Sequence, residues 1–104
     1  MASKSPLPPP SPIPHMEGLE NLGEVAVQLG QLAEAKASYE RSLKIRVTLA
    51  AADKNNAQAQ RDLSISLERL GEVAGKMGQL AEAKASYERS LKIRETLAAA
   101  DKND

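Results

Sequence analysis

The sequence predicts an all-α fold made of two stacked antiparallel helical hairpins. Three observations lead to this fold class: a long internal repeat, apolar residues at helical spacing, and a composition rich in strong helix formers such as Ala, Leu, Glu and Lys. The chain has 104 residues, with no Cys, Trp or Phe and only two Tyr. Its core must therefore consist mainly of aliphatic side chains, which fill space only where helices lie close together.

The repeat has an offset of 48 residues. Gln31–Arg46 and Gln79–Arg94 have the same sequence, and the match extends without a gap over Leu19–Asn56 and Leu67–Asp104. Two copies this similar indicate either a recent duplication or a deliberate consensus. The copies differ at six pairs of positions, which are Asn21/Arg69, Val27/Gly75, Gln28/Lys76, Leu29/Met77, Val47/Glu95 and Asn56/Asp104.

Each copy contains two segments in which apolar residues recur at intervals of three and four, as in amphipathic helices. Gly30 and Gly78 separate the two segments of each copy and favour a tight turn between helices. The stretch Asp53–Asn56 contains capping residues and no apolar side chain, so it predicts the turn between the repeats. We expect four helices, near residues 18–29, 32–52, 57–77 and 80–100.

The first sixteen residues differ from the rest because they contain all six prolines. Proline lacks an N–H donor and restricts the residue before it, so we expect polyproline II or unordered chain there rather than helix. We interpret 1–16 as a Pro-rich tail and a vector-derived linker, since His15–Met16 matches a common cloning junction. Two repeats follow, at about 17–56 and 57–104, and the first helix should be about two turns shorter than its counterpart.

Small residues and a tyrosine recur at the same spacing in the two copies, from Leu22-Gly23 to Tyr39 and again from Leu70-Gly71 to Tyr87. This spacing resembles the tetratricopeptide repeat. The resemblance implies a right-handed α-solenoid in which small residues let the helices approach and tyrosines fill the space between hairpins. Both tyrosines should be at least half buried between helices, and Tyr39 should matter more for stability than Tyr87, because only Tyr39 has repeats on both sides. The family's unit is typically about 34 residues, so this sequence looks like a long 48-residue variant. The signature positions are Leu22, Gly23, Ala26, Gly30, Ala35 and Tyr39, and again Leu70, Gly71, Ala74, Gly78, Ala83 and Tyr87.

Several classes of function are disfavoured by composition. The formal net charge is zero and His15 is the only histidine, so the sequence predicts no nucleic-acid partner, no metal and no cofactor, and the protein is not expected to be an enzyme. Glu40 lies four residues from both Lys36 and Lys44, which favours a self-neutralised helix face over a nucleic-acid contact. No apolar run reaches the roughly 18 residues of a membrane span, and no secretory signal is visible. We therefore expect a cytoplasmic protein without a membrane partner.

The predicted function is protein–protein interaction, and self-association is its first form. About three repeats are normally needed to bury the apolar faces of such units, and this chain has two. Repeats without polar caps expose stacking surfaces, so we expect a homo-oligomer. Its C-terminal face should include Leu91, Ile93 and Leu97. A closed dimer is favoured, because the shortened first helix would spoil head-to-tail stacking.

The alternative form is a monomer with a peptide-binding groove of mildly acidic character. The resemblance implies that the first helix of each repeat lines a concave surface, where carboxylates would suit a basic or neutral peptide. An ordinary solvated surface is the competing interpretation of the same residues. The candidate groove residues are Glu20, Asn21, Glu24, Gln28, Glu68, Arg69, Glu72 and Lys76.

Overall fold

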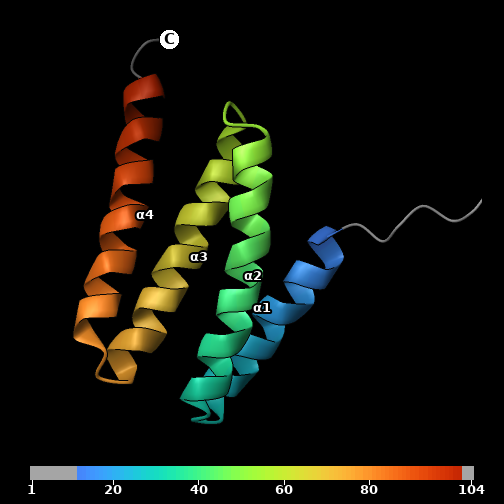
Figure 1. Ribbon diagram of the computed structural model, residues 1–104, viewed down its shortest axis with the longest axis vertical. Helices are drawn as coiled ribbons and strands as arrows, with labels where there is room; N and C mark the ends of the chain where they lie inside the picture. Colours follow the sequence, from blue (N-terminus) through green and yellow to red (C-terminus); the bar gives the residue numbers. More distant parts are fainter. Residues whose placement is uncertain (1–11, 102–104) are drawn as a thin grey trace, which may run out of the picture.

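The structure, a computed structural model, describes residues 12–101 and is all-α over that range, which confirms the predicted fold class (Figure 1). The helices form two antiparallel hairpins, α1–α2 and α3–α4, and α2 packs on α3 to join them. The four helices are α1 (Pro12–Gln28), α2 (Leu32–Ala52), α3 (Ala57–Lys76) and α4 (Leu80–Asp101).

Two equivalent glycine turns close the hairpins. Gly30 has φ of +77° and Gly78 has φ of +79°, in the left-handed region that favours glycine. In the first turn the Gln31 N–H donates to the Ala26 carbonyl at 2.8 Å, and the Gly30 N–H donates to the Val27 carbonyl at 3.0 Å. The second turn repeats both bonds at the same distances. This pairing satisfies carbonyls that the end of a helix would leave free, so each glycine ends a helix as predicted.

The turn between the repeats lies at Asp53–Asn56, as the sequence predicts. Asn56 caps α3, because its side-chain oxygen accepts a hydrogen bond from the Ala59 N–H at 3.0 Å. The extended backbone of Asn56 places that oxygen over the first turn of the helix. Four polar residues are thus sufficient to reverse the chain between α2 and α3.

The start of the first helix differs from the expectation. The predicted absence of helix in 1–16 is wrong over its last five residues, since α1 begins at Pro12; the remainder lies outside the described residues. The first four N–H groups of a helix have no partner within it, so Pro12 and Pro14 remove no backbone bond there. Helix α1 has 17 residues and α3 has 20, so the shortening is less than one turn rather than two. Met16 belongs to the core, with an exposed fraction of 2%.

The core consists of two clusters, and α2 and α3 contribute to both. The first joins the two hairpins; its buried members are Ala26, Ala35, Tyr39 and Val73, with Val27, Leu70 and Met77 packed against them. The second lies towards the other end of α2 and includes Ala50, Leu63 and Leu67, with Leu43, Ala59 and Ile93 packed against them. Short side chains at Ala26 and Ala35 let the helices approach closely enough for this packing.

Gly23 is required by the ring of Tyr39. A Cβ atom at Gly23 would lie 2.6 Å from Cε1 of Tyr39, whereas one at Gly71 would lie 3.1 Å from Cζ of Tyr87. The Tyr39 ring is buried and the Tyr87 ring is not, so only Tyr87 has room to move.

We therefore expect Gly23→Ala to lower the free energy of unfolding by about 1–2 kcal/mol, since the clash outweighs the higher helix propensity of alanine. Gly71→Ala is the matched control and should be neutral or stabilising by up to about 1 kcal/mol. Urea titrations of both variants measure the difference. An equal loss at the two positions would contradict this account of the Tyr39 contact.

Candidate functional site

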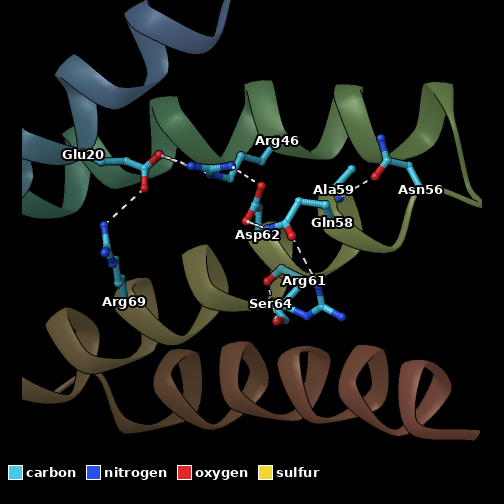
Figure 2. A network of polar contacts seen from close by, with 9 residues as sticks. All are labelled: Glu20, Arg46, Asn56, Gln58, Ala59, Arg61, Asp62, Ser64 and Arg69. Atoms are coloured by element: carbon cyan, nitrogen blue, oxygen red, sulfur yellow. Dashed lines mark hydrogen bonds and ion pairs between the residues drawn. The ribbon is translucent and has the colours of Figure 1, made fainter. Parts of the chain in front are cut away.

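Glu20 is the centre of an ion-pair network that connects three helices (Figure 2). One carboxylate oxygen accepts from Nη2 and, at 3.2 Å, from Nε of Arg46 in α2. The other accepts from Nη1 of Arg69 in α3 at 3.1 Å. Arg46 also lies 3.5 Å from the carboxylate of Asp62, at the start of α3. The Glu20 side chain is 12% exposed, so this network belongs to the interior of the junction between the repeats.

The second repeat contains the equivalent ion pair between Glu68 and Arg94, but no described residue of a third helix joins it. Glu68 forms an ion pair with Nε of Arg94 at 2.7 Å and accepts a hydrogen bond from the Ser90 hydroxyl at 3.1 Å. Arg69, which joins Glu20 across the junction, is replaced in the first repeat by Asn21. The Glu68 side chain is 39% exposed, since nothing among the described residues covers it from beyond α4.

A second polar contact crosses the junction on the side of the glycine turns. Lys36 Nζ in α2 lies 2.6 Å from the carboxylate of Glu82 in α4 and donates to the side chain of Gln79 at 2.7 Å. Lys36 therefore pairs across the repeats, rather than along its own helix with Glu40 as the spacing suggested. Charged contacts thus flank the apolar first cluster and hold the two hairpins in one register.

The predicted groove residues have different environments. Glu20 is buried with both oxygens paired, and Glu68 and Arg69 are partly buried in ion pairs. Lys76 and Glu72 are exposed and form a pair within α3 at 3.6 Å. The remaining three candidates, Asn21, Glu24 and Gln28, are exposed on α1. Their role in a peptide groove stays a prediction, and Glu20 has no free oxygen to offer a ligand.

Burial raises the pKa of Tyr39 above its ordinary value of 10.0, and the carboxylates of Glu24, Glu72 and Glu20 raise it further, while Arg69 lowers it. Four groove candidates from α1 and α3 thus act on one phenol. The unfolded chain releases this proton first as the pH rises, so the folded state loses stability above about pH 10.

We expect Tyr39→Phe to remove this part of the alkaline loss of stability. The check is to measure the free energy of unfolding between about pH 8 and 11. Tyr87→Phe is the matched control, because it removes a phenol from the same local sequence. Identical pH profiles for the Tyr39→Phe variant and the unmodified chain would contradict the raised pKa.

The N-terminal face is an exposed apolar surface on α1, formed by Leu22, Val25 and Leu29. The equivalent residues of the second repeat, Leu70, Val73 and Met77, pack in the first cluster against repeat one. Val25 is 51% exposed and Val73 is 2% exposed, although the surrounding sequences are nearly the same. The sequence predicts exposed stacking surfaces at the ends but did not identify the residues of this face. The offset of 48 residues could have identified them, because it pairs each of these side chains with one that packs on repeat one.

The C-terminal face is the corresponding surface on α4, formed by Leu80, Tyr87 and Leu91. Of the three predicted members, Leu91 is exposed, whereas Ile93 packs on the second cluster and Leu97 is partly buried. The prediction is wrong for Ile93 because the turn of the helix directs it towards α3. Both tyrosines are at least half buried, as predicted, with Tyr39 6% exposed and Tyr87 45% exposed.

Two hollows lie away from the predicted groove. The larger has a volume of about 670 Å³ and lies among the second half of α2, the start of α3 and the second half of α4. Its lining includes Val47, Leu63, Lys92 and Leu97. The smaller, of about 450 Å³, lies beside Met16 between α1, α2 and α3. None of the eight groove candidates lines either hollow.

The arrangement of two helical hairpins with small residues at the helix contacts agrees with a comparison of sequences. The family model described as tetratricopeptide repeat matches residues 17–46 and 65–97, which together make up more than half of the chain. The chain belongs to the tetratricopeptide repeat family. No curated protein and no solved structure matched it.

The tetratricopeptide repeat is a non-enzymatic interaction module, and its repeats generally mediate protein–protein interaction. Across residues 12–101, no group of three or more His, Cys, Asp and Glu side chains is placed to hold a metal ion. None of the four described helices is both long and apolar enough to cross a membrane.

Proposed function

We propose that this tetratricopeptide protein is a self-associating interaction module whose end faces bind a second copy of the chain. One observation carries the proposal: side chains that are exposed at the two ends are equivalent to side chains that are buried where the repeats meet. Leu22, Val25 and Leu29 correspond to Leu70, Val73 and Met77, and Tyr87 corresponds to Tyr39. Contiguous apolar surfaces of this kind mark interfaces.

We also infer that the repeat is a long variant of the family's unit. The two family matches begin at residues 17 and 65, in the same register as the internal sequence repeat. Helices α2 and α4 have 21 and 22 residues, so each extends about 30 Å. Residues 47–64, which include the last turn of α2 and the start of α3, lie between the matched segments. The additional residues support the second core cluster at Ala50 and Leu63.

Light scattering coupled to size exclusion tests self-association directly. The mass should rise above the 11.1 kDa of one chain as the concentration increases from about 10 µM to 0.5 mM. Val25→Glu should lower the mass, because it places a charge in the N-terminal face. Val47→Glu is the matched control: Val47 is exposed away from both faces, and the other repeat has Glu95 at that position. A mass of one chain at about 0.5 mM would overturn the proposal.

A monomeric peptide groove is the second candidate, and one observation favours it. Glu24, Arg69 and Glu72 all act on the pKa of Tyr39, so these three candidates lie near one part of the α1–α3 surface. Their excess of carboxylates suits a basic or neutral peptide. Polarisation of a labelled lysine-containing peptide should then rise with protein, and Glu24→Lys should weaken binding more than Glu40→Lys on α2. No binding at about 0.5 mM protein would contradict this candidate.

A further inference from the structure

The junction between the two repeats shows how one end face fits the other. In it, α3 of repeat two places Leu70, Val73 and Met77 against repeat one, and Lys36 pairs with Glu82 beside them. Because the repeats are nearly identical, a shift of 48 residues converts the contacts of this junction into contacts between two copies, except where the two repeats differ in sequence. The internal junction is therefore a structural template for the association of chains.

We propose that copies of this chain associate head to tail in the register of the internal junction, with Lys84 of one copy paired to Glu34 of the next. The inference rests on the proposed self-association and adds its geometry. Leu22, Val25 and Leu29 of the next copy would occupy the places of Leu70, Val73 and Met77. In the receiving copy Tyr87 would take the place of Tyr39, beside Ala74 and Ala83, which correspond to Ala26 and Ala35 and are already buried within one chain.

The charges at the two ends complement each other in this register. Lys36 contacts Glu82 at 2.6 Å and Gln79 at 2.7 Å, and the shift turns these partners into Glu34 and Gln31. The Lys84 side chain is 80% exposed, and its nearest carboxylate, Glu88 of the same helix, is 3.8 Å away. Glu34 is exposed and forms no ion pair with any described residue.

Two ion pairs of the internal junction have no counterpart between copies. The Glu20–Arg69 pair becomes Glu68 facing Asn21, and the Arg46–Asp62 pair loses its carboxylate, because the sequence has proline at position 14. Contact between copies is therefore weaker than contact between repeats of one chain, and the association is reversible. Asn21 and Arg69 are one of only six pairs that differ between the repeats, and this pair lies directly on the junction.

The same charges distinguish head-to-tail contact from a closed two-fold dimer. A dimer of two C-terminal faces would place Lys84 on both sides of the contact and Glu34 on neither. The sequence favours a closed dimer only if the first helix is about two turns shorter than its counterpart. In the structure α1 is less than one turn shorter than α3. Head-to-tail contact leaves one N-terminal and one C-terminal face free, so the assembly remains open and grows with concentration.

A mixing experiment separates these geometries. Val25→Glu blocks the N-terminal face and Leu91→Glu blocks the C-terminal face, and both residues are exposed, so each variant keeps its fold, as circular dichroism will check. Each variant alone should have the mass of one chain, 11.1 kDa, and their equimolar mixture should form a dimer that grows no further. If either variant alone still dimerises, or if the mixture stays monomeric while the unmodified chain associates, the head-to-tail register is overturned and self-association stands. A monomeric unmodified chain would overturn both.

Charge reversal tests the proposed ion pair. Lys84→Glu and Glu34→Lys should each raise the dissociation constant about 5-fold, and the double variant should recover most of the loss. Lys54→Glu, in the turn between the repeats, is the control and should change it less than about 2-fold. Asn21→Arg should lower the constant about 5-fold, because it restores the counterpart of the Glu20–Arg69 pair. Sedimentation equilibrium measures all of these constants. Failure of the double variant to recover, or no gain from Asn21→Arg, would overturn the register.

Discussion

Replacing Tyr39 with alanine should lower the free energy of unfolding by about 3–5 kcal/mol, as expected for loss of a buried aromatic side chain. The same change at Tyr87 should cost only about 1–2 kcal/mol, because nearly half of that side chain is already in water. The two tyrosines lie in identical sequences from Gln31 and Gln79 onward, so local propensity cancels in the comparison. The difference measures the contact between the repeats alone.

Urea denaturation at about 5 µM protein is the appropriate measurement, because dilution keeps copies apart. At higher concentration the cost of Tyr87→Ala should increase, since association would cover that ring. A larger cost at Tyr87 than at Tyr39 in dilute solution would contradict the order in which the hairpins stack.

Replacing Glu20 with alanine should lower the free energy of unfolding by about 3 kcal/mol. The change leaves the guanidinium of Arg46 partly buried beside α1 without its main partner, and an uncompensated charge in the interior is costly. Glu68→Ala is the matched control, because Glu68 occupies the same position in the second repeat and also pairs with an arginine. It should cost about 1 kcal/mol or less, since its pair with Arg94 is open to water.

We expect the larger cost at Glu20 because Arg69 of α3 also pairs with it. An ion pair with one arginine is not the reason, since Glu68 has such a pair too. Glu20→Ala in an Arg69→Asn background should therefore cost less than in the unmodified chain, by about 0.5–1 kcal/mol. Chemical denaturation of the unmodified chain, the two single variants and the double variant measures the free energies of this double-mutant cycle. Equal costs at Glu20 and Glu68 would show that Arg69 does not join the repeats through Glu20.

The helix ends and the turns could be predicted from the sequence, because they depend on residues that are close together along the chain. The glycines that end α1 and α3, the cap at Asn56 and the bounds of α2 follow from turn chemistry and apolar spacing, which act over a few residues. The start of α1 was missed because proline was treated as incompatible with any helix. In the first turn its missing N–H has no consequence, and the burial of Met16 favours a helix that includes this residue.

The candidate site was harder to predict from the sequence, because it consists of contacts between residues of different hairpins. Glu20 looked like an exposed groove residue, and its burial follows from Arg46 and Arg69, which approach from two other helices. Ile93 looked like an end-face residue, and its contact with α3 follows from the rotation of α4. Neither fact is present in any short stretch of the chain.

The sequence by itself determined four helices, their turns and the family. The tertiary structure decided which of two residues with the same local sequence is buried. Tyr39 and Tyr87 share their local sequence and their helix, yet one is 6% exposed and the other 45%. Helix formation depends on backbone bonds within a segment, whereas burial depends on whether another hairpin occupies the space beside it. The sequence of one repeat therefore does not show which of its apolar side chains a neighbouring repeat covers.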